Sequence, residues 1–306
     1  MKAVRFHEYG DFDVLRVEEV EDPVPGAGEL LLRVRAAGVN PIDWKIVHGW
    51  VSGGKPLAEP RGLGFDVAGI VEQVGPDVSG VVPGDELLGS PTSPSYAELA
   101  LSRPGLLVRR PPGVPWNVAG GLGVVVGTAY ATLARLAVEE GETLLVLGAS
   151  GGVGSMATQL AAARGVRVIG TSSPSKLEQV RALGATPVAY GDGLAERLRE
   201  AAPEGVDAAL DASGHGELAA AVALAGGPER VLTIASSADA AELGVEFHAG
   251  GGGEHMVSAL EEVLPLVESG AISFPLAGAY DLGEVGDALR ESEHGHPAGK
   301  LVVTPG

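Results

Sequence analysis

The stretch LGASGGVGSMATQ, residues 147–159, holds the residue types in this sequence that are best suited to chemistry. It follows the apolar run TLLV and reads Ala149-x-Gly151-x-x-Gly154, which is the dinucleotide-binding pattern with alanine at its first position. In that pattern Gly151 lets the backbone approach a pyrophosphate, Gly154 lets the helix pack on the sheet, and the helix N-terminus faces the phosphates. Because glycine-rich turns also occur without ligands, a connection without chemistry stays open as an alternative.

The same turn satisfies a second pattern. GASGG matches the G-x-S-x-G nucleophile elbow of serine hydrolases, with Ser150 as the nucleophile. Asp211 and several histidines follow it in the chain order that a hydrolase needs. The elbow explains neither the further glycine one turn into the helix nor the many strands upstream. A serine hydrolase is therefore the second hypothesis.

The next apolar run, VRVIGTSSPSK, indicates which dinucleotide would bind. An acid about 20 residues beyond the glycines contacts the adenine ribose and favours NAD. Here the segment offers Thr171, Ser172, Ser173 and Lys176, and no carboxylate precedes Glu178. Hydroxyls and a cation suit a 2′-phosphate, whereas a carboxylate would repel it. The sequence therefore predicts NADP, although the same residues could form only a helix N-cap beside a solvated lysine.

The sequence contains no cysteine, which excludes disulfides, thiol catalysis and zinc–thiolate sites. A cluster with metal-ligand character, ESEHGH, contains His294 and His296. Two histidines in an acidic, glycine-containing turn are more typical of a solvated loop. We therefore expect no metal site.

Composition disfavours several classes of protein. With 306 residues, 45% of them hydrophobic and only 4% aromatic, the chain can bury a large core built from Ala, Val and Leu. A net charge of −19 disfavours nucleic acid and anionic membranes as partners. The first residues, MKAVRFHEYGDFDV, carry charges and no apolar segment, and the stretch VAGGLGVVVGTAYATLA is too rich in Gly, Ala and Thr for a membrane span. We expect a soluble, cytoplasmic protein whose partner is a small molecule.

The pattern of elements divides the chain. The first hundred residues read as short strands separated by Pro and Gly, as a small β-barrel requires. From residue 143, apolar runs alternate with helical stretches, which predicts a parallel sheet with helices on both faces. The fold class is therefore α/β, with a doubly wound sheet.

Several segments along nearly the whole chain match one family in its order: AAGVNPIDWKIVHG, GFDVAGIVEQVG, GDELLG, GTAYATL, GASGGVG, ALGATPVAY and GKLVV. On these segments the chain resembles the zinc-free quinone oxidoreductase and alkenal/enone reductase branch of the medium-chain dehydrogenase/reductase superfamily. The resemblance implies a GroES-like β-barrel catalytic domain, residues 1–117 and 270–306, and an inserted Rossmann NADP-binding domain, residues 118–269. It also implies a homodimer.

The resemblance implies a set of cofactor contacts in the inserted domain. Thr128 would contact the diphosphate or the nicotinamide ribose, Tyr190 the adenosine half, Ser236 the nicotinamide, and Phe247 would close over the ring. The pyrophosphate would lie on Ser150, Gly151, Gly152 and Val153, and the 2′-phosphate on Ser172, Ser173 and Lys176. Tyr190 could equally be an ordinary aromatic at a strand end.

The catalytic candidates lie in NPIDWKIVHGW. By resemblance Asn40 lies beside the nicotinamide, where it could donate to an enolate oxygen. Asp43 and Lys45 could orient substrate or relay a proton, or could form only an ion pair or a helix cap. Trp44 and Trp50 are candidate walls for a planar substrate.

The chemistry follows from a missing metal ligand. Zinc-dependent relatives carry Gly-His-Glu where this chain has GFD, and Phe65 cannot bind a metal ion. Without a Lewis acid a simple ketone is a poor substrate, whereas quinones and α,β-unsaturated carbonyls need less activation. We predict an NADPH-dependent enone or quinone reductase. A protein that binds NADPH without catalysis is a third hypothesis.

Overall fold

The computed structural model describes residues 1–250, 255–295 and 299–306. The chain folds as two compact units. The first unit comprises residues 1–124 and 252–306, and the second unit comprises residues 125–251. Each unit is described by itself.

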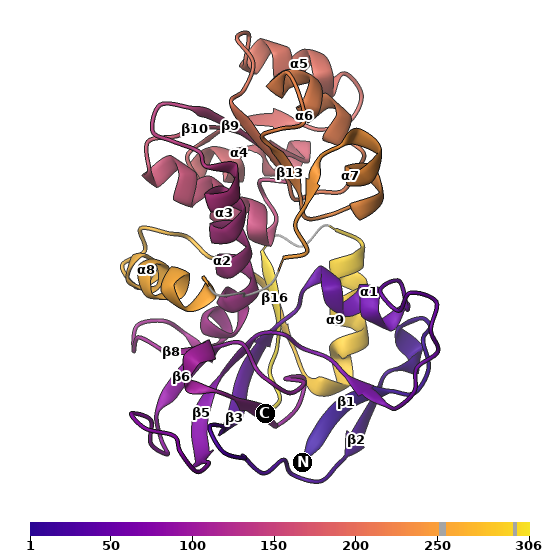
Figure 1. Ribbon diagram of the computed structural model, residues 1–306, viewed down its shortest axis with the longest axis vertical. Coiled ribbons are helices and arrows are strands. Elements are labelled where there is room, and N and C mark those ends of the chain that lie inside the picture. Colours follow the sequence, from indigo (N-terminus) through magenta and orange to yellow (C-terminus); the bar gives the residue numbers. More distant parts are fainter. Residues whose placement is uncertain (251–254, 296–298) are drawn as a thin grey trace. The chain divides into compact units, whose positions relative to one another are not determined.

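The second unit is built on a parallel sheet of six strands in the order β11-β10-β9-β12-β13-β14 (Figure 1). Every neighbouring pair is parallel. The strands are β9 (Thr143–Leu147), β10 (Arg167–Ser172), β11 (Ala185–Ala189), β12 (Ala208–Asp211), β13 (Val231–Thr233) and β14 (Glu246–Phe247). This order confirms the predicted doubly wound sheet. The chain leaves β9 in one direction and later returns to its other side, which makes the carboxyl end of β9 the switch point where such sheets bind ligands.

Helices follow these strands because small apolar residues recur at helical spacing. They are α3 (Gly152–Ala163), α4 (Leu177–Ala182), α5 (Leu194–Ala201), α6 (Leu218–Ala225) and α7 (Ser237–Leu243). Helices α3 and α4 contact β9, β10 and β11, while α5, α6 and α7 lie next to one another (Figure 1). All five residues of β9 are buried, as expected of a strand with both faces covered. The glycine-rich turn therefore starts from a rigid central strand.

The first unit is mainly antiparallel. One sheet has the order β15-β16-β3-β5-β6-β8, with β7 also paired to β3, and a smaller sheet has the order β2-β1-β4. The strands are β1 (Lys2–Phe6), β2 (Arg16–Glu19), β3 (Leu30–Gly38), β4 (Arg61–Gly62), β5 (Val67–Val74), β6 (Glu86–Gly89), β7 (Leu99–Ser102), β8 (Leu107–Arg109), β15 (Leu276–Tyr280) and β16 (Lys300–Val303). Strand β16 pairs with β3, so a segment that follows the second unit in sequence completes this sheet.

Three α-helices of the first unit are α1 (Pro41–Val47), α8 (Met256–Glu268) and α9 (Val285–Glu293). Helix α1 packs against α9, and α8 packs against β6 and β8. The expected domain bounds, 1–117 with 270–306 and 118–269, differ from those of the compact units mainly at α8. Its apolar stripe, Met256, Ala259, Leu260, Val263 and Leu264, is buried against the first unit. The assignment of catalytic and cofactor-binding domains stays a prediction.

Helix α2 (Trp116–Leu136) is the uncharged stretch seen in the sequence. Among the described residues it is the one helix long and apolar enough to cross a membrane, but 67% of that window is buried, as in a core helix. Its glycines permit close packing within the first unit. A Cβ on Gly120 would lie 2.5 Å from Ala36 Cβ, and a Cβ on Gly123 would lie 2.6 Å from Asp66 Oδ1.

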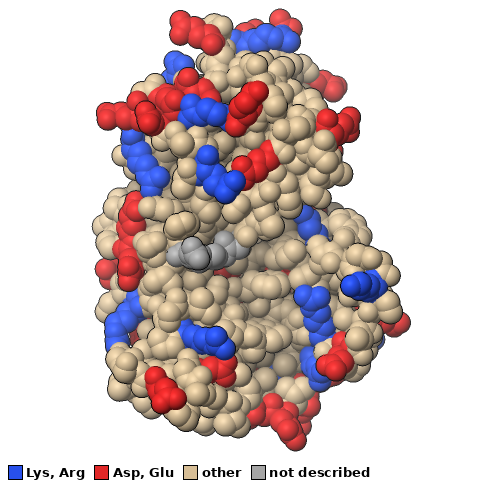
Figure 2. Space-filling model, viewed as in Figure 1, with Lys and Arg blue, Asp and Glu red and all other residues tan. Residues whose placement is uncertain are grey.

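Short 3-10 helices complete the described elements: η1 (Phe12–Val14), η2 (Pro104–Leu106), η3 (Pro174–Lys176) and η4 (Leu282–Glu284). On the face drawn in Figure 2, basic side chains lie among acidic ones and form no continuous basic stripe. This distribution, with the net charge of −19, does not resemble a nucleic-acid-binding surface.

Candidate functional site

The glycine-rich turn connects β9 to α3, and three of its glycines differ in what they permit. Gly148 has φ +80°, a conformation that side chains rarely adopt. A Cβ on Gly154 would lie 2.2 Å from Gly148 O, so α3 could not approach the strand. Gly151, the N-cap of α3, is exposed, with φ −78° and ψ 175°, and a Cβ there would meet no heavy atom nearer than 3.4 Å.

Gly151 therefore serves neither backbone conformation nor packing within the chain. A side chain at this position would occupy the open space above the helix N-terminus. Backbone amides there favour an anion, and glycine allows a phosphate to come close. This geometry fits the pyrophosphate of a dinucleotide.

Ser150 does not have the surroundings of a hydrolytic nucleophile. The nucleophile of a strained elbow is expected to have a positive φ, and Ser150 does not have one. Among the described non-glycine residues a positive φ is found at Asp77 and Ala137. Asp211, the expected acid, accepts hydrogen bonds from Ser213 N at 2.9 Å and from Thr233 Oγ1 at 2.7 Å. Within the described residues no histidine hydrogen-bonds to Ser150 or Asp211. The geometry does not favour the hydrolase.

The predicted 2′-phosphate residues at the end of β10 differ in their exposure to solvent. Thr171 is fully buried, and its Oγ1 accepts from Gly148 N at 3.0 Å, so it supports the glycine turn. Ser172 is 1% exposed, and its hydroxyl donates to Ser173 O at 3.2 Å. Ser173 and Lys176 are half-buried, and partial burial lowers the pKa of Lys176. Ser173 and Lys176 are thus the more accessible members of the set.

The structure adds Glu217, which sequence reasoning missed. Its Oε2 accepts from Thr171 Oγ1 at 3.4 Å. Burial, followed by the nearby Asp211 carboxylate, raises the pKa of Glu217. This acid reaches β10 from the segment after β12, and no local pattern in the sequence links the two positions.

The remaining predicted cofactor contacts lie on separate elements of the second unit. Tyr190 follows β11, with its ring centroid 6.0 Å from that of His215. Thr128 is buried on α2, and the hydroxyl of Ser236 caps α7. Phe247, 41% exposed, lies on β14 at the edge of the sheet. Their roles toward a ligand stay predictions.

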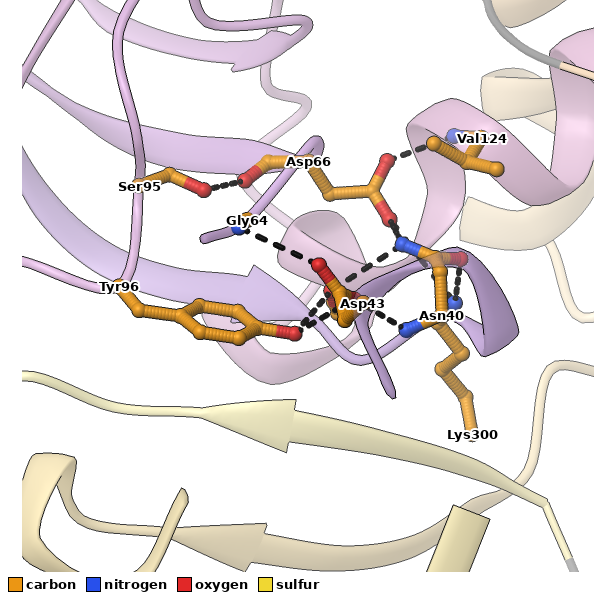
Figure 3. A network of polar contacts seen from close by, with 9 residues as sticks. Asn40, Asp43, Gly64, Asp66, Ser95, Tyr96, Val124 and Lys300 are labelled. Atoms are coloured by element: carbon orange, nitrogen blue, oxygen red, sulfur yellow. Dashed lines mark hydrogen bonds and ion pairs between the residues drawn. The ribbon is translucent and has the colours of Figure 1, made fainter. Parts of the chain in front are cut away.

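Asn40, the N-cap of α1, lies in a buried polar network of the first unit (Figure 3). Its Nδ2 donates to Asp66 Oδ2 at 2.9 Å and to Gly38 O at 3.1 Å. Its Oδ1 accepts from Lys300 Nζ at 2.6 Å. Asn40 is only 2% exposed. The network thus uses both donors of the residue that sequence reasoning expected to donate to an enolate.

Asp43 has the geometry of a buried helix cap. Its Oδ2 accepts from Asn40 N and from Tyr96 OH, each at 2.8 Å, and its Oδ1 accepts from Gly64 N at 3.3 Å. Burial raises the pKa of Asp43 to about 6, although these hydrogen bonds and Lys300 oppose the shift. The cap alternative therefore describes its contacts, and a direct catalytic role is untested.

Lys45 and the two tryptophans lie outside this network. Lys45 Nζ is 5.5 Å from the ring centroid of Trp44, and partial burial lowers the pKa of Lys45. Trp44 meets Trp50 edge to face at 5.3 Å, and Trp50 is 65% exposed. His48 stacks on Trp50, which indicates a small aromatic cluster at the end of α1.

Asp66, Tyr96 and Lys300 are members of the network that sequence reasoning did not select. Asp66 is 1% exposed and Lys300 is 6% exposed. Burial raises the pKa of Asp66 and lowers the pKa of Lys300, and the attraction between the two groups opposes both shifts. A signal did exist, because each charge stands beside an apolar strand, in GFDVAGIV and in GKLVV.

Among the described residues, no group of three or more His, Cys, Asp or Glu side chains could hold a metal ion. Phe65 is 37% exposed and offers no ligand atom. In the histidine pair noted in the sequence, His294 follows α9 and His296 lies outside the described residues.

The chain is similar in sequence and in structure to known proteins. Two family models match: "Alcohol dehydrogenase GroES-like domain" over residues 26–162 and "Zinc-binding dehydrogenase" over residues 152–249. The chain is 33% identical to 2-methylene-furan-3-one reductase of Solanum lycopersicum, over 100% of this chain and 79% of the relative. It is also 33% identical to NADPH-dependent alkenal/one oxidoreductase, chloroplastic, of Arabidopsis thaliana, over 100% and 80%. Quinone oxidoreductase from Coxiella burnetii has a similar structure, with a TM-score of 0.85, 26% identity and 99% coverage of both chains.

A GroES-like unit joined to a Rossmann sheet defines an oxidoreductase of the dehydrogenase type, and the expected fold class is confirmed. The chain belongs to the medium-chain dehydrogenase/reductase superfamily, in its zinc-free quinone oxidoreductase and alkenal/enone reductase branch.

Proposed function

We propose that this protein is an NADPH-dependent reductase that acts on the C=C bond of an α,β-unsaturated carbonyl or on a quinone, without zinc. The names of its relatives support this function. The observation that carries it is the open turn at Gly151, followed by a β10 end with hydroxyls and a lysine in place of an acid. When bound, NADPH supplies the hydride.

The chain's own residues bind and orient the cofactor. The amides at the start of α3 would hold the pyrophosphate, because the helix dipole favours negative charge there and Gly151 leaves room for it. Ser173 and Lys176 would hold the 2′-phosphate, since a hydroxyl and an ammonium can both donate to it. Thr171 keeps the turn in place through its bond from Gly148 N.

Substrate choice follows from what the chain lacks. Phe65 stands where zinc-dependent relatives carry histidine, and the sequence has no cysteine. With no Lewis acid to polarise a carbonyl carbon, reduction at a conjugated carbon is favoured, because the resulting negative charge is delocalised onto oxygen. Trp44 and Trp50 provide aromatic surface for a planar electrophile.

NADPH deuterated at C4 tests this function on a panel of 2-alkenals, cyclic enones and quinones. The expected enone product carries deuterium on the β-carbon and a solvent hydrogen on the α-carbon, as seen by NMR. Treatment with a chelator should leave the rate unchanged. Deuterium at the carbonyl carbon would contradict the mechanism, and binding of NADPH without turnover across the panel would favour a binding protein.

We also propose a cytoplasmic homodimer. The edge position of β14 and the exposure of Phe247 support an interface there, because an unpaired strand edge can extend a sheet. Light scattering after size exclusion should give twice the chain mass of 30.9 kDa. A monomer at micromolar concentration would contradict the dimer.

A further inference from the structure

The loop between β12 and α6, residues 212–217, borders the carboxyl edge of the parallel sheet. In the strand order β11-β10-β9-β12, two strands separate β11 from β12. The ring centroid of His215 on this loop nevertheless lies 6.0 Å from that of Tyr190, which follows β11. The loop also approaches the glycine-rich turn, since a Cβ on Gly148 would lie 3.1 Å from Ser213 Cβ. It therefore runs past the ends of β9 and β10, where such sheets bind dinucleotides.

Glu217, at the end of this loop, brings a carboxyl group to the end of β10. Its Oε2 accepts from Thr171 Oγ1 at 3.4 Å, and the same Oγ1 accepts from Gly148 N at 3.0 Å. In dinucleotide folds that bind NAD, an acid at the end of this second strand accepts from the adenine ribose. The β10 segment has no such acid, and Glu217 supplies a carboxyl group there from a different strand.

The carboxyl group of Glu217 has capacity for a further donor. Within the described residues its partners are the hydroxyls of Thr171 and Ser213, and no lysine or arginine forms an ion pair with it. A carboxylate offers about four lone-pair sites, so two hydroxyls leave part of it unused. Burial, followed by the Asp211 carboxylate of β12, raises the pKa of Glu217, and the two hydroxyls oppose this shift. Because the side chain is only half-buried, a ligand at the sheet edge can reach it.

We propose that Glu217 is a specificity-determining residue that accepts from the adenine ribose 2′-hydroxyl of NADH and opposes the 2′-phosphate of NADPH. The inference rests on the proposed function, because it concerns the cofactor of that reductase. A hydroxyl is the donor that a carboxylate needs, whereas a phosphate brings a like charge. Lys176 and Glu217 therefore act in opposite directions. The chain discriminates less against NADH than the β10 segment alone predicts.

Glu217→Gln removes the charge and keeps the size of the side chain. We expect the Kd for NADPH to fall about threefold and the Kd for NADH to rise about threefold, so the preference shifts about tenfold toward NADPH. Titration calorimetry with both cofactors measures the shift, and Glu196→Gln, an exposed acid of α5, is the matched control. Should Glu217→Gln fail to fold, Glu217→Ser gives the same comparison. Equal changes for the two cofactors, or none, would overturn the inference, because an acid that only supports the turn affects both alike.

The pH dependence of cofactor preference gives a second readout. Because burial raises its pKa, Glu217 keeps its proton to a higher pH than an exposed glutamate does. As pH rises from about 5 to about 8, the preference for NADPH over NADH should therefore fall in wild type relative to Glu217→Gln. A phosphate monoester also titrates near pH 6, but it does so with both proteins, so their difference reports Glu217. Parallel pH curves for the two proteins would overturn the role of this charge.

Binding and turnover together separate this inference from the function on which it rests. The expected shift in Glu217→Gln, in a protein that reduces no enone or quinone, would refute the reductase function and keep the inference. Turnover of an enone by a protein whose cofactor preference is the same with and without the Glu217 carboxylate would overturn the inference and keep the function.

Discussion

Lys176 ends η3, just beyond β10, in a segment where Glu178 is the first acid. If its ammonium group donates to the 2′-phosphate, Lys176→Ala should weaken NADPH binding by about 1–3 kcal/mol and leave NADH binding nearly unchanged. Titration calorimetry with both cofactors measures the difference. Equal losses for NADPH and NADH would place Lys176 outside the phosphate site, and Lys55→Ala is a control for the loss of one charge.

Candidate site residues that lie next to a local motif could be selected from the sequence. Contacts between residues that are distant in the sequence could not be predicted from it. Ser173 and Lys176 could be selected because they follow an apolar strand about 20 residues beyond the glycines, and their contact with a cofactor stays a prediction. Lys300 and Asn40 are 260 positions apart and meet only because β16 pairs with β3. Glu217 likewise accepts a hydrogen bond from Thr171, 46 positions away in the sequence. Such contacts depend on strand pairing, which no short pattern encodes.

The turn between β9 and α3 offers a matched pair of variants at the level of the element. Gly154→Ala should destabilise the protein by about 1–3 kcal/mol, because its Cβ would meet Gly148 O at 2.2 Å. Gly151→Ala should cost about 1 kcal/mol or less, because its backbone is extended and its surroundings are open, so the cost is that of replacing glycine by alanine at an N-cap.

The two variants should differ in the opposite order in their affinity for NADPH, with the larger loss in Gly151→Ala. Gly151→Ala should weaken NADPH about tenfold or more, since the methyl group would occupy the space of the phosphate. Urea unfolding and cofactor titration on both variants give the comparison. Normal NADPH affinity in Gly151→Ala would contradict the assignment of this turn as a pyrophosphate site.

The elements themselves were predicted better than their surroundings. Alternating apolar and helical stretches after residue 143 indicated the parallel sheet, because each element has a local period. Helix α8 carries an apolar stripe in its sequence, but such a stripe indicates only that one face is buried. It does not say against which strands, and α8 packs on β6 and β8 of the first unit.

Buried acids make the stability of the whole molecule depend on pH. The pKa of Asp43 is about 6 in the folded chain, against about 3.9 in an unfolded chain, so the folded state retains this proton longer. Its contribution to stability is present below pH 4 and is lost as pH rises through 6, by about 3 kcal/mol in total. Burial shifts the pKa of Asp66 in the same direction.

Asp43→Asn should therefore flatten the fall of the unfolding free energy between pH 4 and pH 7. Urea unfolding at several pH values measures the slope, with Asp192→Asn, an exposed acid, as the control. Glu142 acts in the opposite direction near pH 4, because its bond from Arg230 lowers its pKa to about 2 in the folded chain while the unfolded carboxyl still takes up a proton there. Both proteins contain Glu142, so the difference between wild type and Asp43→Asn is free of its contribution. An equally steep slope in Asp43→Asn would contradict the assignment.

The pairing of β16 with β3 has a consequence for synthesis on the ribosome. Residues 125–251 are contiguous, so the six parallel strands can close as soon as that segment has emerged. Synthesis of the first unit begins before that of the second unit and ends after it. Ala37 and Gly38 of β3 can pair only after Val303 and Val302 of β16 have been made. Asn40 meets Lys300 only then. In a growing chain the Ala37–Gly38 end of β3, beyond the part that pairs with β7, lacks its β16 partner through the making of more than 250 residues, and this end is where a nascent-chain chaperone would act.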